Sequence, residues 1–130
     1  MSRNSMDAIL KFNTPIIIFL LTLASGVWLS HSGKPLNTVI FTIHKLIALA
    51  AVVITSMQIY NIFKNMEIQS ILITLVIVAG LCVLALFVSG ALMSVGLQVY
   101  DLLLNIHKMA MVLIAASMAL IIYILSGVKL

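Results

Sequence analysis

Four long apolar stretches, each with at most one charged residue, constrain what this 130-residue chain can fold into. They cover residues 12–33, 36–60, 68–100 and 102–128, and only the second and the fourth contain a lysine. A membrane-spanning helix needs about 20 residues, so each stretch is long enough to cross a bilayer. Because lipid offers the backbone no hydrogen-bond partners, such stretches are expected to be helical.

The composition excludes several other classes of protein. Hydrophobic residues make up 64% of the chain and charged residues 8%, whereas about a quarter of the residues in a soluble domain are charged. A soluble globular enzyme and a disordered chain are therefore both excluded. The net charge of +4 comes from scattered single residues without a basic stripe, so no nucleic-acid partner is expected. Cys82 is the single cysteine, which excludes an intramolecular disulfide, a C-x-x-C zinc site and a c-type haem.

The apolar pattern predicts an all-α integral membrane protein with one domain over residues 1–130. We expect helices near residues 15–30, 36–60, 68–94 and 99–125. The connections around 32–35, 61–67 and 95–98 are short, which favours antiparallel neighbours in an up-down-up-down four-helix bundle. The first stretch follows basic residues as a signal peptide would, but it has a counterpart later in the chain and is therefore interpreted as a membrane helix.

The basic residues predict the orientation of the chain in the membrane. One face carries four basic residues, namely Arg3, Lys11, Lys64 and Lys129. The other face carries Lys34, together with Lys45 and Lys108 if their side chains reach it. Basic residues are enriched on the cytoplasmic side, so both termini are predicted to be cytoplasmic.

The second half of the chain repeats the first half, with repeat 1 at about 12–60 and repeat 2 at about 68–125. Ser25 and Gly26 match a serine and a glycine 64 positions later, and His44 and Lys45 match a histidine and a lysine 63 positions later. The pairs are Ser25/Ser89, Gly26/Gly90, Gly33/Gly96, His44/His107, Lys45/Lys108 and Tyr60/Tyr123. The chain is therefore interpreted as two repeated helical hairpins, and functional sites of membrane repeats often lie at the repeat interface.

The repeated histidines and glycines predict a haem site. His44 and His107 each lie about eight residues into their helix, or about 12 Å from its start. Gly26 and Gly90 lie near the ends of the preceding helices, so all four residues can share one layer of the bundle. A haem iron takes an axial imidazole from each side, and glycine permits a close approach to the flat macrocycle.

The lysines that follow the histidines fit the same interpretation. Side chains on a helix tilt towards its N-terminus, so Lys45 and Lys108 can extend to the near membrane surface and bind haem propionates. Alternatives remain open at this point. The histidines could make interhelical hydrogen bonds, the glycines could serve helix packing, and the lysines could contact lipid phosphates. His31 has no repeat partner and is interpreted as an interfacial residue.

The pattern of His44, His107, Gly26 and Gly90 resembles the four-helix core of membrane b-type cytochromes, namely cytochrome b and cytochrome b561-like proteins. The resemblance covers all four spans and implies a non-covalent haem b whose iron is bound by the two histidines. Those families commonly hold two haems, with a second histidine about four turns along each ligand helix. Gln58 and Ile121 occupy these positions here, so we expect a single haem near one membrane surface.

The resulting hypothesis is a membrane cytochrome that transports electrons, as an electron carrier or an oxidoreductase subunit rather than a stand-alone enzyme. Its expected partners are the lipid bilayer, a quinone-like lipid carrier and an extracytoplasmic redox protein. Four alternatives remain open: a haem-bearing anchor subunit of a larger redox complex, a haem-free four-span transporter, a structural protein, and a haem sensor or carrier. The sequence leaves the oligomeric state open, with a homo-oligomer among the options.

Overall fold

The computed structural model describes residues 10–33, 37–96 and 98–127, and long α-helices dominate this part of the chain. The helices are α2 (Asn13–His31), α3 (Thr38–Phe63), α4 (Ser70–Ser94) and α5 (Tyr100–Gly127). All four are long and apolar enough to cross a membrane. The predicted all-α fold with four candidate membrane spans is therefore confirmed.

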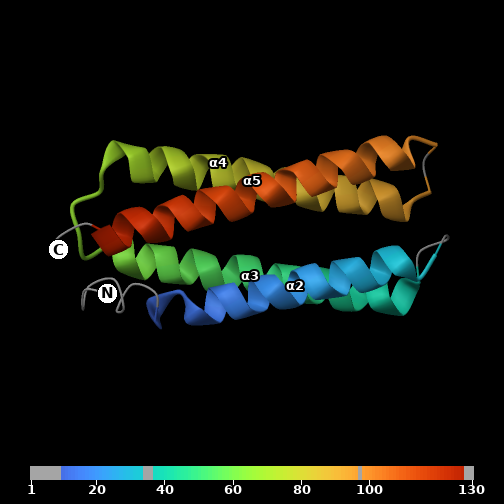
Figure 1. The fold of residues 1–130 in the computed structure, drawn as a ribbon, viewed down its shortest axis with the longest axis horizontal. Helices are drawn as coiled ribbons and strands as arrows, with labels where there is room; N and C mark the ends of the chain where they lie inside the picture. Colours follow the sequence, from blue (N-terminus) through green and yellow to red (C-terminus); the bar gives the residue numbers. More distant parts are fainter. Residues whose placement is uncertain (1–9, 34–36, 97, 128–130) are drawn as a thin grey trace. The chain divides into compact units, whose positions relative to one another are not determined.

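The four helices form two helical hairpins. Helix α2 packs against α3 in one compact unit that extends to Met66, and α4 packs against α5 in a second unit that begins at Glu67. Within each unit the two helices run side by side in opposite directions, as Figure 1 shows. The predicted organisation into two helical hairpins is confirmed.

Local side-chain and backbone chemistry sets the helix ends. Oδ1 of Asn37 accepts hydrogen bonds from the backbone N–H groups of Val39 (3.0 Å) and Ile40 (3.2 Å), so α3 begins at Thr38, two residues later than predicted. Gly33 and Gly96 have φ angles of +88° and +76° just beyond the ends of α2 and α4. This left-handed conformation is typical of the glycine that terminates a helix. Lys34 and Pro35, which the predicted turn includes, lie outside the described residues.

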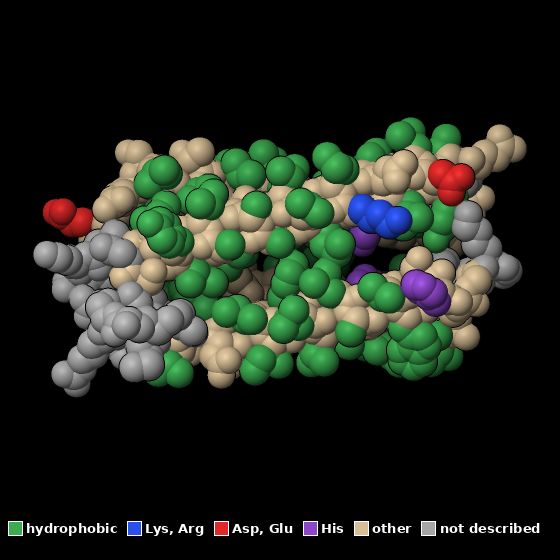
Figure 2. Space-filling model, viewed as in Figure 1, with side chains coloured by type: hydrophobic (Ala, Val, Ile, Leu, Met, Phe, Trp, Pro, Cys, Tyr) green, Lys and Arg blue, Asp and Glu red, His purple; other side chains and the backbone are tan. Residues whose placement is uncertain are grey.

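The two hairpins bury matching positions along their helices. The buried residues at repeat-equivalent positions form the pairs Pro15/Ala79, Ser25/Ser89, Leu29/Met93 and Ile40/Leu103. Many large apolar side chains instead face outwards, and Figure 2 shows hydrophobic groups along the length of the helices. Extensive exposed apolar surface is unfavourable in water and suits contact with lipid. The fold is therefore that of an integral membrane protein.

Candidate functional site

The first hairpin places His44 of α3 against the end of α2. His44 is half-buried, and its Nδ1 lies 2.9 Å from Oγ of Ser25. Ser25 is only 6% exposed, and its hydroxyl also lies 2.9 Å from the backbone carbonyl of Thr22. The histidine is therefore held by a buried serine that is itself bonded to its own helix.

The second hairpin contains the same arrangement. Nδ1 of His107, which is half-buried in α5, lies 2.9 Å from Oγ of Ser89 in α4. Ser89 is 2% exposed, and its hydroxyl donates to the carbonyl of Leu86 at 3.2 Å. Thr22 and Leu86 are also 64 positions apart, so each partner in this short hydrogen-bond chain has its repeat equivalent.

The hydrogen-bond chain links the position of the serine hydrogen to the position of the proton on each imidazole. A serine hydroxyl has a single hydrogen, and in Ser25 and Ser89 the nearby backbone carbonyl can accept it. In one tautomer Nδ1 accepts the serine hydrogen; in the tautomer that leaves the serine hydrogen on the carbonyl, Nδ1–H of the histidine donates to the serine oxygen. In this second tautomer Nε2 carries the lone pair, and Nε2 is then the atom with which a neutral imidazole binds a metal.

Gly26 and Gly90 give the imidazoles room to approach the backbone of the preceding helix. A Cβ atom on Gly26 would lie 3.1 Å from Cε1 of His44, whereas a Cβ atom on Gly90 would lie 3.6 Å from Cε1 of His107. The first distance is too short for an undisturbed contact, and the second is an ordinary van der Waals separation. Each glycine therefore contacts the histidine of its own hairpin, and Gly26 does so more tightly.

The two lysines adjoin the histidines in sequence and are exposed. Nζ of Lys45 lies 5.7 Å from the ring centroid of Phe41, one turn closer to the start of α3. This direction agrees with the tilt expected for a helical side chain. Lys108 follows His107 in α5 and is likewise exposed.

The two helices place their histidines at similar distances from their own starts. His44 is six residues beyond Thr38 and His107 is seven beyond Tyr100, which correspond to about 9 Å and about 10 Å. Both distances are shorter than the predicted 12 Å because each helix begins later than expected.

His31 differs from the other two histidines. It is exposed in the last turn of α2, and its Nδ1–H donates to the carbonyl of Val27 at 2.9 Å. The histidine therefore bonds within its own helix, and its exposure agrees with the interfacial role that the sequence predicts.

The sequence alone does not reveal the roles of Ser25 and Ser89. Both were visible as members of the repeat, since each precedes a repeated glycine. Their function as histidine partners depends on which face of α2 or α4 packs against the next helix. The four large apolar stretches give no clear indication of that face, so the hydrogen bonds emerge only from the structure.

Within the described residues, no group of three or more His, Cys, Asp or Glu side chains could hold a metal ion. Comparison of the chain with protein-family models, curated proteins and solved structures finds no match. The case for function consequently rests on the repeated serine–histidine–glycine arrangement.

Proposed function

We propose that this protein is a membrane b-type cytochrome with one haem b whose axial ligands are His44 and His107. The observation that carries the proposal is the duplicated Ser–His hydrogen bond, at 2.9 Å in each hairpin. Metal-bound histidines characteristically donate their other ring N–H to a nearby acceptor, which fixes the tautomer and the ring orientation. In both hairpins a serine oxygen lies 2.9 Å from Nδ1, where it can accept this bond, and this supports a bis-histidine haem.

The remaining predicted residues have roles around the two ligands. Gly26 and Gly90 allow the imidazoles to lie close to the neighbouring helix, and Lys45 and Lys108 supply positive charge for the haem propionates. When bound, a haem with two protein ligands supplies one-electron transfer, because neither axial position is open to oxygen. The proposed electron partners are a quinone-like lipid carrier and an extracytoplasmic redox protein, and the termini are proposed to be cytoplasmic.

A reduced-minus-oxidised visible spectrum of the detergent-purified full chain tests the proposal. We expect sharp low-spin b-type bands, and we expect His44→Gly and His107→Gly each to remove them. His31→Gly is the matched control, because it removes an exposed histidine from the end of α2, and it should retain the bands. Added imidazole should restore the bands in the two ligand variants, which separates loss of a ligand from loss of the fold. A protein that stays colourless after haem addition would contradict the proposal.

A haem-free structural protein is the second candidate function. It is favoured by the same hydrogen bonds, because a histidine bonded to a serine on the adjacent helix can hold two membrane helices together without a cofactor. In that case His44→Gln and His107→Gln should lower the stability of the protein while no haem is bound by the parent chain. The spectrum described above therefore distinguishes the two candidates.

A further inference from the structure

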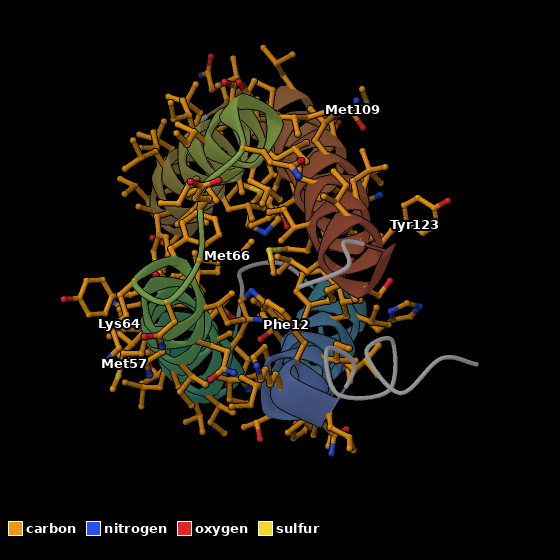
Figure 3. All side chains as sticks on the ribbon, turned by 90° about the vertical axis from the view of Figure 1, so that its left-hand side faces the viewer. Phe12, Met57, Lys64, Met66, Met109 and Tyr123 are labelled. Atoms are coloured by element: carbon orange, nitrogen blue, oxygen red, sulfur yellow. The ribbon has the colours of Figure 1, made fainter. Side chains whose placement is uncertain are left out.

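The first hairpin has an open pocket at the end far from His44. It lies between the start of α2 and the end of α3 and has a volume of about 340 Å³. Its lining consists of Lys11, Gln58, Asn61, Ile62, Asn65 and Met66. Figure 3 is viewed from this end of the hairpin and labels Phe12 at the start of α2 and Lys64 beyond the end of α3.

The lining is polar at positions where the second hairpin is apolar. One repeat later, the counterparts of Lys11, Gln58 and Asn61 are leucine and isoleucine, namely Leu75, Ile121 and Ile124. Gln58 and Asn61 lie in α3 and their counterparts lie in α5, so a membrane helix can carry apolar side chains at these two positions, whereas Lys11 precedes α2 and Leu75 lies within α4. The polar side chains at these two positions of the first hairpin therefore call for an explanation other than the fold.

The chemistry of the lining selects an anionic ligand. Lys11 supplies an ammonium group with three donors, and the carboxamides of Gln58 and Asn61 supply further N–H donors. No carboxylate is among the lining residues that the structure describes. Asn65 is held in place because its Nδ2 donates to the carbonyl of Asn61 at 3.0 Å.

The position of the pocket selects a phosphate group. Lys11 lies two residues before the start of α2 and Asn65 lies two residues after the end of α3, so the pocket lies at the ends of these two candidate membrane spans. Phospholipid phosphates lie at this depth, and the charge distribution predicts that this end is cytoplasmic, where anionic lipids attract basic side chains. We propose that this pocket binds an anionic phosphate group, in the form of a phospholipid headgroup or of free phosphate.

A quinone headgroup fits the pocket less well. Gln58 lies fourteen residues after His44 in α3, which separates them by about 21 Å along the helix axis. This is most of the thickness of the hydrocarbon core of about 30 Å. A redox carrier in the pocket would therefore lie far from His44, whereas a structural phosphate has no such distance requirement.

Native mass spectrometry of the full chain in detergent tests the proposal. The probes are phosphatidylglycerol, phosphatidylcholine and inorganic phosphate, each added to the parent protein and to three variants. We expect one phosphatidylglycerol per chain in preference to phosphatidylcholine, and we expect Lys11→Gln to weaken that binding about fivefold. Lys64→Gln is the matched control because it removes the same charge at the same end from a residue outside the lining, and it should leave the affinity unchanged.

The third variant and the phosphate arm complete the test. The double substitution Gln58→Ile and Asn61→Ile introduces the residues of the second hairpin, and it should weaken binding while the helices remain suited to the membrane. A phosphatidylglycerol adduct that persists in excess inorganic phosphate identifies a lipid headgroup. A phosphate adduct that depends on Lys11, without a preference for phosphatidylglycerol, identifies free phosphate. Equal weakening of binding by Lys11→Gln and Lys64→Gln would overturn the proposal. Binding of phosphatidylglycerol and of inorganic phosphate that does not depend on Lys11 would also overturn it.

Discussion

The two hairpins match each other around their histidines and differ at their opposite ends. Around His44 and His107 the serine partner, its carbonyl acceptor and the adjacent glycine are all duplicated. At the far end, the first hairpin has a polar pocket where the corresponding residues of the second are leucine and isoleucine. Polar groups are costly in a membrane span. The duplicated polar set therefore points to the same role in each hairpin, whereas the residues that line the pocket of the first hairpin point to a role that the second hairpin does not share.

Alanine substitution of Gly26 and of Gly90 should give the largest difference in stability between the two hairpins. Gly26→Ala places a Cβ atom 3.1 Å from Cε1 of His44, and the ring cannot retreat without stretching its bond to Ser25. We expect a loss of about 1–2 kcal/mol in the free energy of unfolding. Gly90→Ala, at 3.6 Å, should instead stabilise by about 0.5–1 kcal/mol, since alanine is the better helix former.

Unfolding of the purified variants in denaturing detergent measures both effects. Gly80→Ala is the control, because no atom beyond its chain neighbours and the adjacent backbone of α4 lies within 4 Å of the added Cβ, so the change isolates helix propensity. If Gly26→Ala were as stable as Gly80→Ala, the tight contact with His44 would have no energetic role, and the difference between the hairpins would be lost.

Alanine at the two serines should have a smaller effect that is the same in both hairpins. Ser25→Ala and Ser89→Ala each remove the hydroxyl that is hydrogen-bonded at 2.9 Å to Nδ1 of a histidine. Interhelical hydrogen bonds in membrane proteins average about 0.6 kcal/mol, so we expect a loss of that order from each variant. Ser32→Ala is the control, because the one hydrogen bond described for the Ser32 hydroxyl is local, to the carbonyl of Leu29.

Loss of the serine partner should also alter the haem if the histidines are its ligands. Each variant should broaden or shift the low-spin bands, because the imidazole is no longer held in one tautomer and orientation. Destabilisation without any spectral change would assign the serines to helix packing alone. Unequal effects of the two variants would contradict the equivalence of the hairpins.

Neutralising Lys45 or Lys108 should give the smallest effect, a shift in the midpoint potential of the proposed haem. Lys45→Met and Lys108→Met each remove a positive charge proposed to lie near the propionates. Reduction of the haem, which adds one electron, then becomes less favourable. A loss of about 0.5 kcal/mol for an exposed charge lowers the midpoint potential by about 20 mV for one electron. Redox titration followed at the low-spin band measures this shift, with Lys64→Met as the distant control. A potential that rises, or falls equally in the control, would exclude the proposed role.

The sequence predicts the membrane helices well because the bilayer imposes their length and apolar character. It predicts their ends less well, since a single capping residue such as Asn37 decides where α3 begins. At the site, the repeat singles out both histidines and both glycines. It does not reveal that Ser25 and Ser89 hold the imidazoles, because nearly every face of these helices is apolar and the sequence alone cannot establish which face meets the neighbour. The unequal contacts of Gly26 and Gly90 likewise depend on backbone positions that differ by fractions of an ångström.

The haem-to-chain ratio of the purified protein, measured together with its low-spin spectrum, tests the central claim most directly. The claim is that the matching histidines of the two hairpins serve one cofactor. It predicts one low-spin haem b per chain, lost when either His44 or His107 is replaced. Two haems per chain, with each histidine variant retaining one, would show that the hairpins act separately. A ratio of zero after haem addition would leave the serine–histidine pairs as structural contacts and contradict the claim.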